Sequence, residues 1–96
     1  MRLQPTFRSI PIPQVRLKDK FWLHRQQVLR SVTLKIEYEQ CERTGRIENF
    51  RRAARGETGT FQGRYYNDSD VYKWIEAAAD LHAALGPDLA VDTLMA

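Results

Sequence analysis

The chain has 96 residues, which leaves room for one small domain and excludes a large multi-layered enzyme within it. Hydrophobic residues make up 43% of the chain and charged residues 28%, a balance typical of folded and not of disordered protein. The net charge is +3, but the 12 acidic residues are interspersed with the basic ones. We therefore expect an ordinary solvated surface and no nucleic-acid partner.

The sequence also bears on location and on metal chemistry. The first residues lack an apolar stretch of signal-peptide length, and no window approaches the roughly 18 apolar residues of a membrane span. We expect a cytoplasmic protein without membrane contact. Cys41 is the single cysteine, which excludes an internal disulfide and gives a zinc ion no neighbouring thiolate ligands. A half-buried thiol that simply packs is the expected role.

Residues 1–18 are predicted to form an extended segment. Two prolines, which cannot donate to a β-ladder, are followed by Val15 and Leu17 in alternation with polar residues, a pattern typical of an edge strand. From Asp19 onward the apolar side chains recur at steps of three and four, and Asp19 can cap the first turn. The pattern predicts an amphipathic helix over about residues 21–30.

For the middle of the chain the sequence allows either a strand or a helix. Residues 32–38 alternate between apolar and polar, which by periodicity alone predicts a half-buried strand. The good helix formers of residues 37–43 favour instead a helix that ends near Gly45. Residues 51–63 contain three glycines and two threonines, and we expect a loop there.

The clearest predicted element begins at Asp68. Apolar residues then recur at helical spacing along one stripe, and Gly86 and Pro87 supply the end of the helix. The members of the stripe are Val71, Trp74, Ile75, Ala78, Leu81, His82 and Leu85. Because His82 lies on this stripe, we expect a core histidine and not a metal ligand or a base. Residues 88–95 are again compatible with a helix.

Three runs of sequence are specific in combination. They are Val15-Arg16-Leu17-Lys18-Asp19-Lys20-Phe21-Trp22, Thr44-Gly45-Arg46-Ile47-Glu48-Asn49-Phe50 and Asn67-Asp68-Ser69-Asp70-Val71-Tyr72-Lys73-Trp74-Ile75-Glu76-Ala77-Ala78. A Phe61-Gln62-Gly63 stretch precedes the last run. In this order the runs resemble the opening of glycoside hydrolase family 127, the β-L-arabinofuranosidases. The resemblance extends from about Pro11 to Leu94 and rests chiefly on the third run.

The resemblance implies a fold. Members of the family have an (α/α)6 toroid of helices joined to β-sandwich modules, and an amino-terminal strand pairs with a sandwich. The implied fold class is mainly α, with residues 1–18 as an extended edge-strand segment. Residues 19–96 would then be the first helices of the toroid, a partial catalytic domain. For residues 32–38 the resemblance favours a connector that leads into a helix over a strand.

The resemblance also implies where the chemistry lies. Members of the family hydrolyse terminal β-L-arabinofuranosyl residues with retention, using a zinc-bound cysteine thiolate as nucleophile and a glutamate as acid/base. Zinc lowers the pKa of a thiol, so this pairing is chemically reasonable. Those residues lie far downstream in the family and have no counterpart here, and Cys41 does not match them. We therefore expect no catalytic residue, no metal ligand and no cofactor in this chain, and no activity of the chain alone.

The resemblance places Asn67, Asp68 and Asp70 at the edge of the sugar pocket, where a loop enters a helix. Amide and carboxylate groups at this position could hydrogen-bond sugar hydroxyls. Helix capping is the alternative, because Asp or Ser at a helix start satisfies free backbone N–H groups without any ligand.

The two residues after this cluster have plainer expected roles. Trp74 lies on the apolar stripe and is expected in the core. Lys73 is expected to pair with Asp70 or Glu76, which stand three residues away on either side.

The residues support two hypotheses of different classes. The first is the amino-terminal portion of a glycosidase, which binds carbohydrate only with the remainder of the toroid, or self-associates through an exposed apolar helix face. The second is a small stand-alone helical binding module whose basic surface, around residues 43–55, meets an acidic partner. A closed module covers its apolar stripe with its own helices, whereas a portion leaves an apolar face exposed.

Overall fold

The computed structural model describes residues 6–59 and 61–96, and the chain is mainly helical over these residues, with no strand among them. The elements in chain order are the 3-10 turn η1 (Ile12–Gln14), α1 (Lys20–Val28), the π-helical turn η2 (Leu29–Thr33), α2 (Leu34–Arg43), α3 (Arg46–Ala54), α4 (Asn67–Leu85) and α5 (Leu89–Met95). The predicted mainly α fold class is confirmed.

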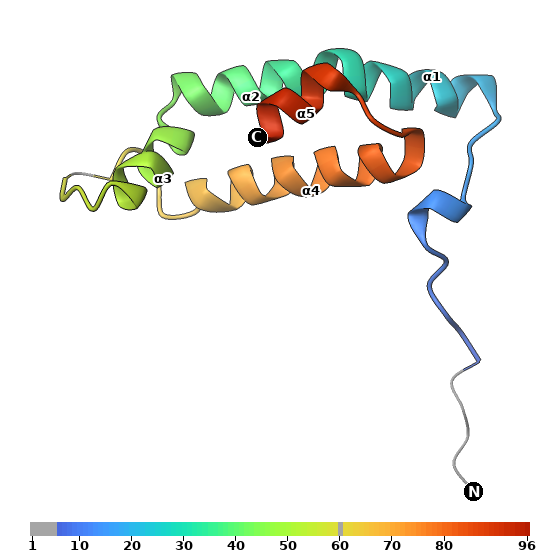
Figure 1. Cartoon of the computed structure of the whole chain (residues 1–96), viewed down its shortest axis with the longest axis horizontal. Helices are drawn as coiled ribbons and strands as arrows, with labels where there is room; N and C mark the ends of the chain where they lie inside the picture. The colour runs from blue at the N-terminus through green and yellow to red at the C-terminus, as the bar shows by residue number, and fades with distance from the viewer. Residues whose placement is uncertain (1–5, 60) are drawn as a thin grey trace, which may run out of the picture.

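The elements α1, η2 and α2 follow one another as a single long rod along one side of the molecule (Figure 1). Asp19 caps the start of the rod, as predicted. Its carboxylate accepts hydrogen bonds from the backbone N–H groups of Phe21 at 2.8 Å and Trp22 at 3.1 Å. Within η2 the backbone N–H of Leu34 donates to the carbonyl of Leu29, the wider spacing of a π turn.

The strand predicted for residues 32–38 is wrong, and no connector interrupts the rod there. The apolar alternation is misleading because it does not describe what is buried: Leu34 is fully buried, whereas Ile36 is 52% exposed. Burial instead follows helical steps of four and three, from Leu34 to the partly buried Tyr38 and the buried Cys41.

Within the amino-terminal segment the turn η1 packs against α4, and the described residues before it project away from the helices (Figure 1). Val15 has extended backbone angles, but Ile12–Gln14 forms a 3-10 turn closed by a 3.0 Å hydrogen bond from the Val15 N–H to the Ile12 carbonyl. No strand pairs with this segment in the described part of the chain, so the predicted edge strand is not confirmed. Residues 1–5 of the predicted segment lie outside the described residues.

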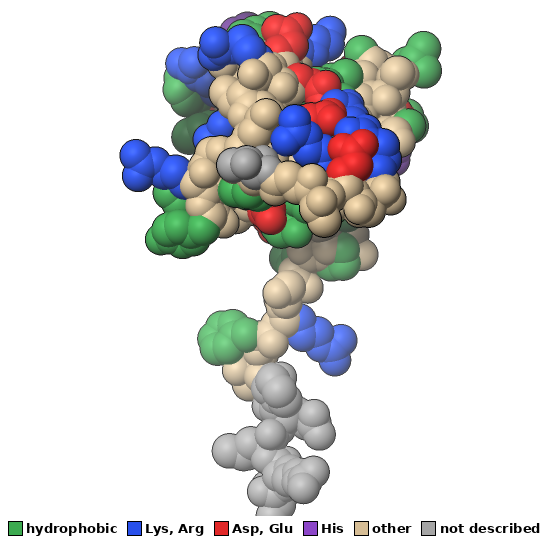
Figure 2. Space-filling view, turned by 90° about the vertical axis from the view of Figure 1, so that its left-hand side faces the viewer, with side chains coloured by type: hydrophobic (Ala, Val, Ile, Leu, Met, Phe, Trp, Pro, Cys, Tyr) green, Lys and Arg blue, Asp and Glu red, His purple; other side chains and the backbone are tan. Residues whose placement is uncertain are grey.

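Helix α3 occupies the first part of the predicted loop over residues 51–63, and that prediction is wrong up to Ala54. The apolar pattern did not reveal α3 because none of its residues is fully buried and much of its surface is charged. Arg51 bonds to Glu42 at 2.6 Å, and Arg55 bonds to Glu48 at 2.8 Å. Figure 2 shows basic and acidic side chains intermixed on this end of the molecule.

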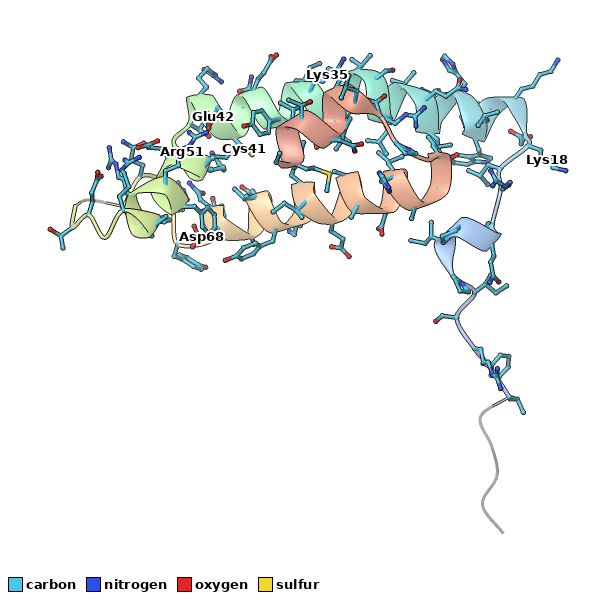
Figure 3. The ribbon with its side chains drawn as sticks, viewed as in Figure 1. Lys18, Lys35, Cys41, Glu42, Arg51 and Asp68 are labelled. Atoms are coloured by element: carbon cyan, nitrogen blue, oxygen red, sulfur yellow. The ribbon has the colours of Figure 1, made fainter. Side chains whose placement is uncertain are left out.

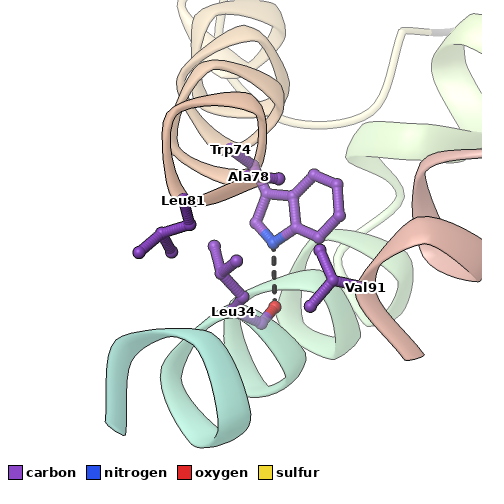
Figure 4. Packing of buried hydrophobic residues seen from close by; sticks show 5 residues of the cluster. All are labelled: Leu34, Trp74, Ala78, Leu81 and Val91. Atoms are coloured by element: carbon purple, nitrogen blue, oxygen red, sulfur yellow. Dashed lines mark hydrogen bonds between the residues drawn. The ribbon is translucent and has the colours of Figure 1, made fainter. Parts of the chain in front are cut away.

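Helix α4 runs antiparallel to α2, and α5 packs against both (Figure 1). The small core lies between these three helices (Figure 4). Trp74 is 6% exposed, and its indole Nε1 donates to the backbone carbonyl of Leu34 at 2.8 Å. The core role predicted for Trp74 is therefore confirmed. The buried apolar residues of the described chain are Leu34, Cys41, Trp74, Ala78, Leu81 and Val91.

The predicted long helix is confirmed as α4, which begins at Asn67 and so one residue earlier than predicted. Its apolar stripe is narrower than predicted. Ile75 is 47% exposed, and the side chain of His82 is 51% exposed, with Nδ1 3.5 Å from the Asp92 carboxylate. The prediction of a core histidine is wrong, because His82 lies at the edge of the stripe and faces a polar residue of α5.

Arg30 of η2 holds the end of α4. Its Nη1 donates to the backbone carbonyls of Leu85 at 3.5 Å and Gly86 at 3.4 Å, and its Nε lies 3.6 Å from the Asp88 carboxylate. Asp88 caps α5 by accepting from the backbone N–H of Val91 at 3.1 Å. A side chain of the π turn thereby fixes the turn between α4 and α5. None of the described helices combines the length and apolar character that a bilayer crossing requires.

Candidate functional site

A hollow of about 480 Å³ lies between α2, the start of α3 and the first turns of α4. Its lining residues are Glu37, Gln40, Cys41, Thr44, Arg46, Asp70, Lys73 and Trp74. We call this feature the α2–α4 hollow. Convergent polar groups beside an aromatic ring in a concave site are typical of small-ligand binding.

One wall of the α2–α4 hollow is an ion pair between α3 and α4. The Arg46 Nε donates to the Asp70 Oδ2 at 2.9 Å, and the Arg46 Nη1 donates to the Thr44 hydroxyl at 2.7 Å. Both charged groups are partly exposed, so the pair holds a carboxylate and a guanidinium at the surface of the hollow.

Lys73 brings a second cation to the α2–α4 hollow. Its predicted ion pair with Asp70 or Glu76 is wrong, since Lys73 forms no ion pair within residues 6–59 and 61–96. The carboxylate of Asp70 is instead paired with the guanidinium of Arg46, which comes from α3. The ammonium of Lys73 is left to donate to other groups in the hollow.

Cys41 lies between α2 and α4 at the floor of the hollow (Figure 3). It is a free, buried thiol, which confirms the packing role and goes beyond the half-burial that was predicted. Burial raises the pKa of the Cys41 thiol, although the nearby Arg46 guanidinium acts in the opposite direction. A thiol with a raised pKa is protonated at neutral pH and is a poor nucleophile.

The three residues predicted for the pocket edge take different positions. Asn67 is 3% exposed and turns toward the preceding loop, with Nδ2 3.5 Å from the Gln62 carbonyl, which also accepts from the Asn49 Nδ2 at 2.8 Å. Asp68 is half-buried at the start of α4 and does not line the hollow (Figure 3). Of the three, Asp70 lines it.

The alternative role for Asn67, Asp68 and Asp70, side-chain capping of the helix, is not observed at the start of α4. The N-cap position is Tyr66, and no side chain accepts from the free N–H groups there. Ser69 instead donates its hydroxyl to the Tyr66 carbonyl at 2.7 Å. Asp68 and Asp70 lie in the first turn, where their negative charges favour the positive end of the helix dipole.

Several lining residues of the hollow were not identified from the sequence. Arg46 lies in one of the runs that carry the family resemblance, but its role depends on contact with Asp70, 24 residues away. Glu37 and Gln40 belong to a segment whose helical character the alternation obscured. The signal that could have found them is the helical spacing of polar residues at positions 37, 40 and 44, which share one face of a helix.

The zinc ion that the family resemblance implies does not fit the described residues of this chain. No cluster of three or more His, Cys, Asp or Glu side chains that could hold a metal ion occurs in the described ranges. The one thiol is buried, and its pKa is raised and not lowered. We therefore derive no zinc chemistry from these residues.

Comparison with known proteins identifies the family. A family model described as "Beta-L-arabinofuranosidase, GH127 catalytic domain" matches residues 14–95, a range that contains all five α-helices and the α2–α4 hollow. A search of curated proteins and a search of solved structures return no match. Because the family match spans most of the chain, the chain belongs to the GH127 β-L-arabinofuranosidase family of glycoside hydrolases.

Proposed function

We propose that this chain is the amino-terminal portion of a glycosidase that removes terminal β-L-arabinofuranosyl residues, and that it is inactive by itself. The observation that carries the proposal is the match of residues 14–95 to the catalytic domain of the family. The nucleophile, the acid/base and the zinc ligands of the family have no counterpart in this sequence. The chain supplies helices and pocket-edge residues, and the remainder of the toroid supplies the chemistry.

The distribution of apolar surface supports a portion of a larger helical layer. The centre of the α4 stripe is covered by the chain's own helices, since Trp74 and Leu81 are both buried. Large apolar side chains remain exposed beside it, among them Ile75 on α4, Ile36 on α2 and Leu89 on α5. Further helices of a toroid would bury this surface, and a second copy of the chain is the other partner that could cover it.

Within the proposed enzyme the α2–α4 hollow forms part of the sugar-binding edge. The Asp70 carboxylate can accept hydrogen bonds from sugar hydroxyls, and the Lys73 ammonium can donate to them. Asp68, two residues nearer the start of α4, would contact a sugar that extends beyond the hollow. The buried Asn67 acts indirectly, because its amide holds the loop before α4 in place.

The stand-alone binding module with a basic surface has less support. The arginines around residues 43–55 were expected to meet an acidic partner. Arg51 and Arg55 are instead bonded to the carboxylates of Glu42 and Glu48 in the same chain. Their charge is largely neutralised locally, so this region is a poor docking surface for an acidic molecule.

The role of Asp70 can be tested in a complete family member that carries the same Asn-Asp-Ser-Asp-Val-Tyr-Lys-Trp run. The change Asp70→Asn at the matching position should lower kcat/KM on a β-L-arabinofuranoside by about tenfold or more, the effect of losing a charged hydrogen bond to substrate. The matched control is Asp68→Asn, the same chemical change outside the hollow. It should have the smaller effect on kcat/KM.

A further variant separates substrate binding from the ion pair. Arg46→Met breaks the Arg46–Asp70 contact but leaves the carboxylate in place, so it should reduce the melting temperature more than the turnover. The proposal for Asp70 fails if Asp70→Asn lowers the melting temperature as Arg46→Met does and leaves kcat/KM unchanged. That result would show that Asp70 holds α3 against α4 and does not bind substrate.

A further inference from the structure

Three aromatic side chains are exposed in the short segment that leads into α4. Phe61 is 43% exposed, Tyr65 is 92% exposed and Tyr66 is 46% exposed. The rings of Tyr65 and Tyr66 lie nearly perpendicular to each other, with their centroids 5.5 Å apart. Single exposed apolar residues are ordinary on a protein surface, but two rings in contact form a continuous aromatic surface. We call Tyr65 and Tyr66 the tyrosine platform.

The backbone is held by side chains both before and at the tyrosine platform. Before it, the Asn49 side chain bonds both backbone groups of Gln62: its Nδ2 donates to the carbonyl at 2.8 Å, and its Oδ1 accepts from the N–H at 3.0 Å. At the platform itself, Ser69 donates to the Tyr66 carbonyl through its N–H at 3.1 Å and through its hydroxyl at 2.7 Å. A surface that is ordered before its ligand arrives loses little entropy on binding.

Tyr66 stands on the side of α4 that faces the α2–α4 hollow. Asp70 follows it by four residues and Lys73 by a further three, a spacing that places all three on one face of the helix. Asp70 and Lys73 both line the hollow. Four residues of helix rise by about 6 Å, which is comparable to the length of one sugar ring. The tyrosine platform therefore begins about one ring beyond the polar groups that are proposed to hold the terminal sugar.

A tyrosine ring beside a sugar-binding hollow suits one kind of ligand. The face of the ring carries partial negative charge, and the C–H bonds on the flat face of a sugar carry partial positive charge, so the two surfaces attract each other. The phenol hydroxyl can also exchange hydrogen bonds with sugar hydroxyls. Two tyrosine rings offer far less than the roughly 800 Å² that each partner buries in a stable protein–protein interface. These features favour a carbohydrate ring over a protein partner.

We propose that the tyrosine platform stacks against the sugar to which the terminal β-L-arabinofuranosyl residue is linked. The inference rests on the proposed function, because it takes the terminal residue to lie in the α2–α4 hollow. The hollow then holds the sugar that is removed, through hydrogen bonds, and the platform holds the sugar that leaves, through ring contact. The platform thereby favours substrates in which a sugar follows the arabinofuranosyl residue over simple alkyl arabinofuranosides.

NMR titration of the complete chain with two probes tests the inference. One probe is methyl β-L-arabinofuranoside, which has a single sugar ring. The other is a disaccharide in which the same residue is linked to β-D-glucopyranose, whose equatorial hydroxyls leave C–H bonds on both ring faces. The disaccharide should bind about three- to tenfold more tightly than the methyl glycoside, and it alone should shift the ring resonances of the tyrosine platform.

Variants of Tyr65 separate the ring contact from other effects. Tyr65→Ala should weaken binding of the disaccharide about three- to tenfold and bring it close to that of the methyl glycoside. Tyr65→Phe keeps the ring and should retain most of the affinity. The matched control is Phe7→Ala, which removes an equally exposed ring, 92% exposed, from the amino-terminal segment and should leave binding of both probes unchanged. Circular dichroism of each variant checks that the fold is retained.

Three results would overturn the inference. They are equal affinity of the chain for the two probes, unchanged disaccharide binding in Tyr65→Ala, and the absence of any shift at the tyrosine platform. If Tyr65→Ala instead weakens binding of the chain to the remainder of a family member, with sugar binding unchanged, the platform packs against protein.

The proposed function is judged separately, by turnover when the chain is combined with that remainder. Turnover together with equal affinities for the two probes would reject the sugar platform alone. Tighter binding of the disaccharide without turnover would reject the proposed function alone.

Discussion

At the scale of single residues, two contacts join different helices: the Trp74 indole N–H donates to the Leu34 carbonyl, and the Arg46 guanidinium donates to the Asp70 carboxylate. The cap at Asp19 and the core position of Trp74 follow from spacing along one helix, and both are confirmed. The pairing of Asp70 with Arg46 joins residues from different helices, which no local rule predicts. The same limit explains His82, whose exposure depends on where α5 packs.

Gly63 lies in the loop before α4, and a side chain at this position should be costly. Its φ is +93°, and a Cβ there would collide with the amide of the buried Asn67. Gly63→Ala should therefore lower the free energy of unfolding in urea by the cost of the left-handed backbone, about 1–2 kcal/mol, and by a further cost for displacing Asn67.

Gly56→Ala is the matched control for this change. Its φ is +68°, but a Cβ there would meet open space, so it carries the backbone cost alone. Equal losses in the two variants would mean that the Asn67 amide moves away freely and does not fix the loop before α4.

At the scale of elements, α4 and the start of α1 were predictable, whereas α3 was not. The first two carry an apolar stripe or a cap that is visible in the sequence. Helix α3 has no fully buried residue. Its ion pairs among Arg51, Arg55 and Glu48 and its ring contact between Phe50 and Tyr72 join residues that become neighbours only after the chain has folded. The prediction of a strand over residues 32–38 failed for a different reason, because the apolar side chains of Val32 and Ile36 face solvent.

The ion pairs of α3 predict how this helix responds to acid. A hydrogen bond from the Arg55 guanidinium lowers the pKa of the Glu48 carboxyl below its ordinary value of 4.5, and the same guanidinium lowers the pKa of Glu57. A lowered folded-state pKa gives stability that is complete above the unfolded value and is lost as pH falls through the folded value. Helix α3 should therefore fray below pH 4.5.

Backbone chemical shifts of α3 and α4 between neutral pH and about pH 3 measure this response. The shifts of α3 should move toward coil values before those of α4, and Glu48→Gln should remove part of the pH dependence. Because these carboxylates are exposed, the effect should be modest and should shrink at high salt. Loss of α3 and α4 at the same pH would show that these ion pairs do not set the stability of α3.

The contact of Arg30 with the turn between α4 and α5 gives a second prediction for an element. Arg30→Ala removes hydrogen bonds to the Leu85 and Gly86 carbonyls and the ion pair with Asp88. Amide hydrogen exchange over residues 86–95 should become faster, with a loss of stability of about 1 kcal/mol. The control Lys35→Ala, on the exposed face of α2, should leave exchange in α5 unchanged. Unaltered exchange in Arg30→Ala would show that the core contact of Val91 alone holds α5.

At the scale of the whole molecule, the chain is a layer of helices with a small core and much uncovered apolar surface. The family match and the helical fold agree with the resemblance that the sequence carries between Asn67 and Ala78. Of the three residues predicted for the pocket edge at the start of α4, Asp70 lines the α2–α4 hollow. Its other groups come from α2 and α3, and their assembly needed the tertiary structure.

Complementation of activity tests the central claim most directly. A GH127 β-L-arabinofuranosidase that lacks its first helices, up to the end of the segment matched here, would be mixed with this chain and assayed on a β-L-arabinofuranoside. The account predicts no turnover by either piece alone and measurable turnover by the mixture. It also predicts a lower rate when the chain carries Asp70→Asn. Turnover by this chain alone, or a mixture that stays inactive although the two pieces bind each other, would contradict the account.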